Sequence, residues 1–197
     1  MKSFIQTETF TAPPTNITES IRYMGDKGIT TETELLINEC LNECVNSIKY
    51  LVCYTIVDVN TYSDHTDLYF FETKSTSLIR NLSKCDKAVI FAATIGIGID
   101  RLIAKYSRLS PSKALCFQAI GAERIEALCD VFCNNIALQY GRIHPRFSPG
   151  YGDFNIDFQN DIFRYLDCSR RIGLTLNSSL IMSPSKSVTA IVGIERR

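Results

Sequence analysis

Apolar residues recur at helical spacing in two long stretches of the chain. The first runs from Thr31 to about Lys49, and Thr31 with Glu34 three residues later forms a capping-box pattern at its start. The second runs from about Ser112 to Leu138, is rich in Ala, Leu, Ile and Cys, and is followed by Gly141. Its composition predicts a long, central and buried helix.

Shorter segments rich in β-branched and aromatic residues predict strands. They cover residues 50–59, 67–72, 87–94, 180–182 and 188–194, with a polar hairpin over 60–66. Short helices are predicted over 19–24, 75–83, 100–106, 160–166 and 168–172. This order lacks the regular strand–helix alternation of a doubly wound sheet. We therefore predict an α+β fold, with a mixed or antiparallel twisted sheet and a long central helix.

The length of 197 residues suits a single domain over residues 1–197, with residues 1–30 as an N-terminal lead-in. Lysine plus arginine (21) balances aspartate plus glutamate (21), which argues against nucleic acid as the main partner. The N-terminus lacks the apolar segment of a signal peptide, and no stretch approaches the roughly 18 apolar residues that span a bilayer. These features predict a cytoplasmic protein that does not enter membranes.

Eight cysteines stand in the chain, and none forms a C-x-x-C pair. Cys40 with Cys44, and Cys129 with Cys133, are spaced four residues apart and share a helix face. A metal site could use such pairs, although it would need further ligands. The alternative is that reduced thiols fill the core as small apolar side chains.

Common cofactor signatures are not met. Gly96 and Gly98 follow a predicted strand, but position 101, where a dinucleotide motif needs a third glycine, is Arg101. The corrinoid-binding pattern D-x-H-x-x-G is not met around His65. The chain therefore has no recognisable cobalamin-ligating histidine of its own.

The segment from Arg146 to Gly152 combines a fixed cation, turn-forming residues and a phenol. Arg146 can clamp a carboxylate through two parallel hydrogen bonds. Pro149 stiffens the loop, Gly150 permits close backbone approach, and Tyr151 offers a π face to a cation such as a sulfonium. On composition alone, a plain surface turn with a chance arginine is an equal alternative.

This loop resembles the R-P-x-P-G-Y loop at the S-adenosylmethionine site of the activation domain of cobalamin-dependent methionine synthase. Phe147 stands where that family usually has proline. Residues 172–179 and 182–188 are similar to two further family segments, and Glu126 lies on a helix like the one whose glutamate contacts the ligand. The resemblance is best over residues 92–192.

The resemblance implies how the site would bind S-adenosylmethionine. Arg146 would hold the ligand carboxylate, and Ser148 would contribute backbone hydrogen bonds within the loop that includes Pro149 and Gly150. Tyr151 would lie along the ligand towards the corrin, and Glu126 would take the amino group or the ribose.

The resemblance also implies a stand-alone subunit that supports reductive remethylation of cobalamin on a partner. That partner would be a corrinoid-bearing methionine synthase lacking its own activation domain, with a flavodoxin-type electron donor. Two alternatives stay open. One is a non-catalytic module that senses S-adenosylmethionine or chaperones a corrinoid protein, and the other is a reactivator of another corrinoid methyltransferase.

Overall fold

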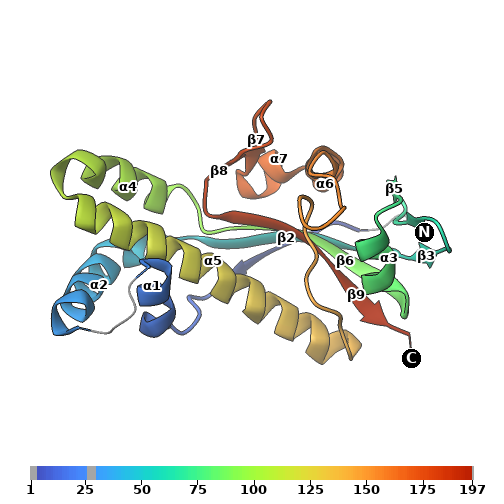
Figure 1. The fold of residues 1–197 in the computed structure, drawn as a ribbon, viewed down its shortest axis with the longest axis horizontal. Helices are drawn as coiled ribbons and strands as arrows, with labels where there is room; N and C mark the ends of the chain where they lie inside the picture. The colour runs from blue at the N-terminus through green and yellow to red at the C-terminus, as the bar shows by residue number, and fades with distance from the viewer. Residues whose placement is uncertain (1–3, 26–29, 197) are drawn as a thin grey trace.

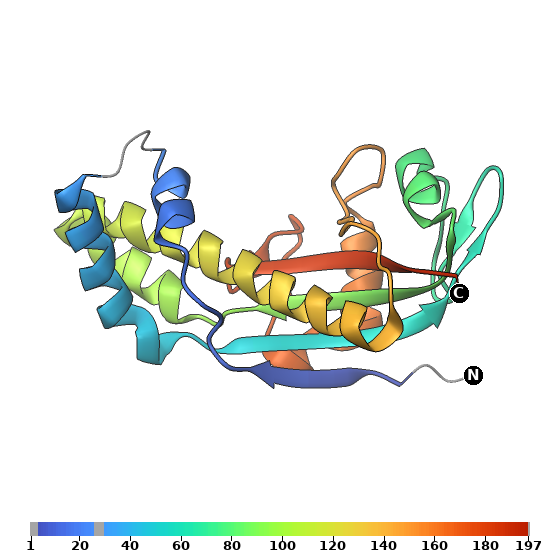
Figure 2. The same ribbon diagram turned by 90° about the horizontal axis from the view of Figure 1, so that it is seen from below.

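The computed structural model describes residues 4–25 and 30–196. Its centre is a four-stranded sheet in the order β1-β2-β6-β9, and every neighbouring pair is antiparallel. The strands are β1 (Gln6–Phe10), β2 (Tyr50–Asp58), β6 (Cys85–Thr94) and β9 (Ser187–Glu195). Figure 2 shows β1 and β9 at the two edges of this sheet. The predicted α+β fold is confirmed, and the sheet is antiparallel.

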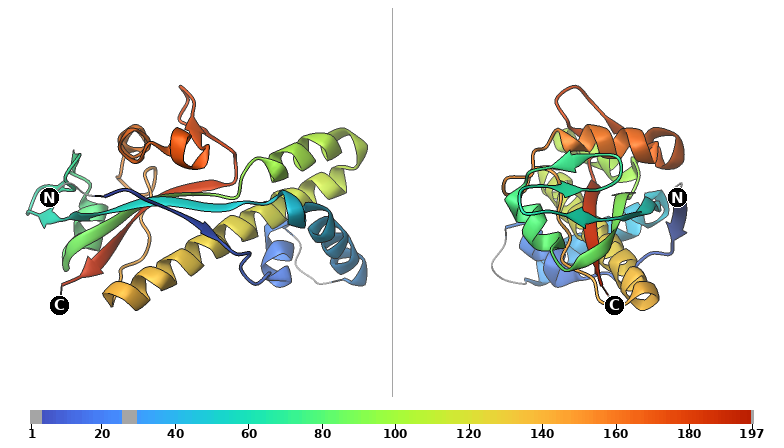
Figure 3. Two further views of the ribbon diagram at one scale, coloured as in Figure 1. Left: turned by 180° about the vertical axis from the view of Figure 1, so that it is seen from behind. Right: turned by 90° about the vertical axis from the view of Figure 1, so that its right-hand side faces the viewer.

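Helices cover both faces of the sheet (Figure 1). The 30-residue α5 (Pro111–Tyr140) lies on one face, and α1 (Ile17–Tyr23), α2 (Thr31–Cys44) and α4 (Gly98–Leu109) pack against it. The opposite face carries α3 (Thr76–Leu82), α6 (Phe158–Leu166) and α7 (Cys168–Ile172). The left view of Figure 3 shows α6 and α7 on one side of the strands and α5 on the other.

The central strand β6 explains why its sequence is almost continuously apolar. Val89 and Phe91 point into the core beneath α5, whereas Ala88 and Ile90 point into the core beneath α6 and α7. Successive side chains of a strand face opposite sides, so a strand covered on both faces needs apolar residues throughout.

Two features of the N-terminal half differ from the prediction. The helix predicted over 19–24 is present as α1, but the lead-in before it also contains the strand β1; residues 1–3 and 26–29 lie outside the described part of the chain. β1 escaped prediction because it is a polar edge strand with one exposed face. The cap of α2 is Thr30, not Thr31, and the helix ends at Cys44 before a 3₁₀ turn, η1 (Val45–Ser47).

The strand predicted over 67–72 is wrong. Between β2 and α3 the structure has three two-residue strands, β3 (Asn60–Thr61), β4 (Thr66–Asp67) and β5 (Glu72–Thr73), and Tyr69, between β4 and β5, has φ +72°. Phe70 stacks on Tyr165 of α6 with ring centroids 4.0 Å apart. These aromatic side chains therefore serve packing rather than a sheet. The strand predicted over 180–182 shrinks to β8 (Met182–Ser183), which pairs with β7 (Thr175–Leu176).

Gly96 and Gly98 make the turn from β6 into α4. Gly96 has φ +77°, and a Cβ on Gly98 would collide with the carbonyl of Ser47. All eight cysteines are buried and unbridged. Within residues 4–25 and 30–196, no group of three His, Cys, Asp or Glu side chains could hold a metal ion. Among the helices of those same residues, none combines the length and apolarity needed to cross a membrane.

Candidate functional site

The segment after α5 runs along the open edge of β9. The N–H of His144 donates to the carbonyl of Gly193 (2.8 Å), and Phe147 exchanges two backbone bonds with Ile191 (2.9 Å each). Proline, which the similar family usually has at this position, could not donate this bond to Ile191. The hydrogen bond from the N–H of Phe147 to Ile191 therefore helps to anchor the loop to the sheet.

The edge of β9 becomes open where the loop leaves it. Along an edge strand, the backbone N–H and carbonyl of every second residue point away from the sheet. Gly193 and Ile191 use these groups to bind the loop, so the N–H and carbonyl of Thr189 point out of the same edge. Thr189 lines the pocket described below. A ligand seated there can meet an N–H and a carbonyl of the sheet itself.

A tight turn follows at Pro149 and Gly150. Gly150 has φ +92°, its N–H donates to the carbonyl of Phe154 (2.8 Å), and Tyr151 donates to the carbonyl of Ser148 (3.2 Å). Asp153 then fastens the loop to the start of α3. Its carboxylate accepts hydrogen bonds from the hydroxyl of Ser75 (2.7 Å), from the N–H (2.6 Å) and the hydroxyl (2.7 Å) of Thr76, and from the N–H of Ser77 (3.1 Å).

These elements enclose a pocket of about 460 Å³ at the β9 edge, between α5 and α6. It is lined by Glu126, Arg146, Phe147, Ser148, Pro149, Tyr151, Gln159, Met182, Ser187, Val188 and Thr189. Five of the six predicted site residues therefore meet at one pocket. The sixth, Gly150, is not in the lining; it shapes the turn.

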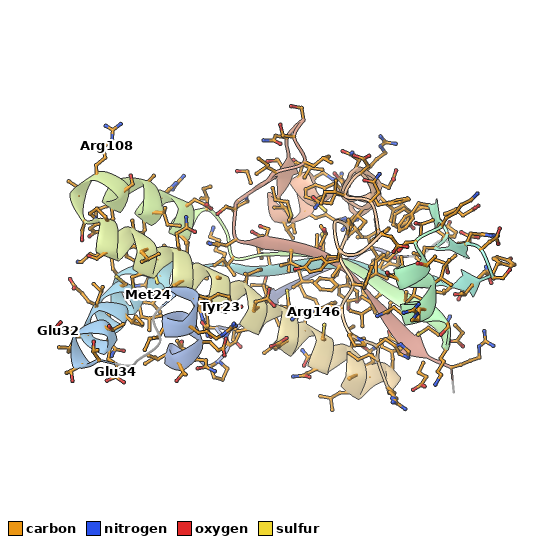
Figure 4. All side chains as sticks on the ribbon, viewed as in Figure 1. Tyr23, Met24, Glu32, Glu34, Arg108 and Arg146 are labelled. Atoms are coloured by element: carbon orange, nitrogen blue, oxygen red, sulfur yellow. The ribbon has the colours of Figure 1, made fainter. Side chains whose placement is uncertain are left out.

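Arg146 lies beside the middle of α5 (Figure 4), where two carboxylates hold it. Its Nη2 donates to Glu126 (3.0 Å) and to Asp130 (2.9 Å). Its Nη1 is buried and has no hydrogen-bond partner within the described residues. A buried cationic nitrogen without an acceptor is unfavourable, so this atom is suited to receive an acceptor from a ligand.

The neighbouring thiol does not neutralise Arg146. Burial raises the pKa of Cys129 to about 12, against the opposing effect of the guanidinium. Cys129 therefore stays protonated near neutral pH. The fixed charges around the guanidinium are the two carboxylates of Glu126 and Asp130.

Glu123, one helical turn from Glu126, binds other residues of the chain and not Arg146. It forms a buried ion pair with Arg124 and accepts from the N–H of Asn16 (3.0 Å). Arg124 also donates to the carbonyls of Pro13 (2.6 Å) and Pro14 (2.7 Å), which ties the segment before α1 to α5. Glu126, by contrast, borders both the pocket at β9 and a second pocket of about 380 Å³ beside α1.

Several lining residues were not predicted as site residues. Met182, Ser187 and Val188 belong to the segment that resembles the family, which is a signal that could have found them. Gln159 carried no signal, because a lone glutamine on a short amphipathic helix is ordinary. Only the packing of α6 against the sheet brings it to the pocket.

No protein-family model matches the chain, and a search of curated proteins finds no match. Among solved structures, the chain is similar to one described as the MetH reactivation domain bound to AdoHcy. The TM-score is 0.71 at 14% sequence identity, over 98% of this chain and 78% of that chain. The fold of the chain is thus that of the MetH reactivation domain, as the sequence resemblance predicted.

Proposed function

We propose that this protein binds S-adenosylmethionine at the β9 edge and presents its methyl group to a corrinoid held by a partner protein. One observation supports this most: a single pocket is lined by five of the residues that the sequence resemblance assigned to this ligand. They are Arg146, Ser148, Pro149, Tyr151 and Glu126. The pocket's volume lies within the range of small-molecule sites. The solved structure with the same fold is described as bound to AdoHcy, the product that remains when S-adenosylmethionine loses its methyl group.

The charges around the pocket suit this ligand. S-adenosylmethionine carries a carboxylate, an ammonium and a sulfonium group, and so has a net positive charge. Arg146 offers its unpartnered Nη1 to the carboxylate, while Glu126 and Asp130 next to it leave a net negative charge for the cationic groups. A purely anionic ligand would meet two carboxylates as well as one guanidinium.

The residues of this chain bind and orient the ligand, and the reaction needs no acid or base from them. Arg146 and the N–H of Ser148 hold the amino-acid end, and Glu126 takes the ammonium or a ribose hydroxyl. Tyr151, with 69% of its surface exposed, lies at the mouth where a partner could approach. A corrinoid on the partner, once reduced by one electron from a flavodoxin-type donor, would supply the electron pair that accepts the methyl group. The carbon–sulfur bond breaks, and the sulfonium leaves as the neutral thioether. Positioning is the protein's contribution to the rate.

The proposal is tested by reductive methylation with a purified corrinoid protein. The protein, the corrinoid partner, a one-electron reductant and S-adenosylmethionine with a labelled methyl group are combined. We expect label on the corrinoid and one equivalent of S-adenosylhomocysteine for each methyl transferred. Arg146→Ala should slow the transfer at subsaturating ligand, whereas Arg108→Ala, at the far end of α4 (Figure 4), should not.

Two results would count against the proposal in different ways. Binding of S-adenosylmethionine without methyl transfer to any corrinoid protein tried would favour a sensing or chaperone module. No binding of the ligand at millimolar concentration would remove the proposed function altogether. Transfer to a corrinoid protein other than methionine synthase would keep the chemistry and change the partner.

A further inference from the structure

The side-chain oxygen of Gln159 is a second buried polar atom at the pocket that has no hydrogen-bond partner among the described residues. Gln159 of α6 has 5% of its surface exposed, and its Oε1 is buried with no hydrogen-bond donor in the described part of the chain. The side chain lines the pocket at β9. Buried amide oxygens are almost always paired, so an orphan that faces a cavity points to a ligand donor.

Gln159 approaches the pocket from the side opposite to Arg146. Arg146 is held by α5, which covers one face of the sheet, and α6 covers the other face. The open edge of β9 at Thr189 lies between them. A ligand whose amino-acid end is fixed at Arg146 must therefore extend its other end across the edge towards Gln159.

We infer that Gln159 is a specificity-determining residue that recognises the adenine base, with its Oε1 accepting a hydrogen bond from the 6-amino group. This inference rests on the proposed function. Adenine is the part of S-adenosylmethionine farthest along the chain of bonds from the carboxylate. Its 6-amino group is an N–H donor, and a glutamine amide is a common partner for the polar edge of adenine. The ligand then fills the two unpartnered positions of the pocket, Nη1 of Arg146 and Oε1 of Gln159.

The test compares two ligands that differ only at this donor. S-adenosylhomocysteine and its 6-deamino analogue, with purine in place of adenine, are titrated by calorimetry into the wild type and into Gln159→Met. Methionine keeps the length and burial of the side chain but removes the acceptor. Asn160→Ala, an exposed amide on the same helix, is the matched control. Thermal unfolding checks that each variant is folded.

We expect the wild type to bind the adenine ligand about tenfold more tightly than the purine analogue, as one buried hydrogen bond implies. Gln159→Met should abolish that preference while binding the purine analogue within about twofold of the wild type. The control should keep the preference. If Gln159→Met weakens both ligands equally, the residue contacts a different donor and the base assignment is wrong. If the wild type binds neither ligand, the proposed function fails as well, so the two failures are distinct.

Discussion

Replacing Arg146 with alanine separates a ligand-binding arginine from a structural one. Its present partners, Glu126 and Asp130, are 45% and 67% exposed in their side chains. Exposed ion pairs of this kind contribute at most about 1 kcal/mol, so the variant should unfold within a few degrees of the wild type. A charge-assisted hydrogen bond from Nη1 to a ligand carboxylate is worth about 1.5–3 kcal/mol. Affinity for S-adenosylmethionine should therefore fall roughly 10- to 150-fold.

Calorimetric titration of the wild type, Arg146→Ala and Arg146→Lys measures this difference. Lysine keeps the charge but loses the planar fork, so its affinity should lie between the other two. Arg108→Ala removes an equal charge away from the pocket and should bind like the wild type. A ligand-binding role of Arg146 is refuted if Arg146→Ala binds as tightly as the wild type, or if it loses binding only because it no longer folds.

Three further predictions concern the scaffold of the site. Gly150→Ala should lower the free energy of unfolding in urea by about 1–3 kcal/mol, because φ is +92° and the new Cβ would lie 2.9 Å from the Ile156 side chain. Gly141 is the control: it has φ +98° but nothing within 4 Å of a new Cβ, so Gly141→Ala should lose less stability. Equal losses in the two variants would contradict this prediction. Arg124→Met leaves the buried carboxylate of Glu123 without its ion-pair partner and should lower the free energy of unfolding by about 3–5 kcal/mol in the same assay. An unchanged free energy of unfolding would show that the ion pair is dispensable. The hydroxyl of Ser75, which caps α3, and then the hydroxyl and N–H groups of the first turn of α3 hold the pKa of Asp153 well below its ordinary value. Its contribution to folding stability is therefore present above the unfolded pKa of about 3.9 and is lost as the pH falls below that value towards the folded pKa. The difference in unfolding midpoint between wild type and Asp153→Asn should thus shrink from pH 7 to pH 3, and a constant difference would disprove the linkage.

Elements with a strong local signal could be predicted from the sequence. The central helix α5 and the strand β6 follow from long apolar stretches, and α7 is bounded by Gly173, whose φ of +65° needs a glycine. The predictions failed where tertiary contacts decide the structure. β1 is polar and exists because it pairs with β2, and the aromatic run at Tyr69 forms no strand because its rings pack on α6.

The candidate site divides in the same way. Arg146 and its loop drew attention because proline, glycine and arginine stand close together in the sequence, but the resemblance was needed to favour a ligand site over a plain surface turn. Glu126 was predicted from resemblance alone, and the structure places it within 3.0 Å of Arg146. Asp130 and Gln159 reach the site only through the packing of α5 and α6 against the edge of β9. No local pattern marks these two residues. Asp130 stands 16 positions from Arg146 in the chain, and Gln159 reaches the pocket only because α6 packs against the sheet.

The central claim is that S-adenosylmethionine binds at the β9 edge, and a crystal structure with S-adenosylhomocysteine tests it most directly. We expect electron density across the edge at Thr189, with the carboxylate on Arg146 and the base beside Gln159. Ligand density in the second pocket beside α1, between Pro13 and Val131, would contradict it, as would an empty site at saturating ligand.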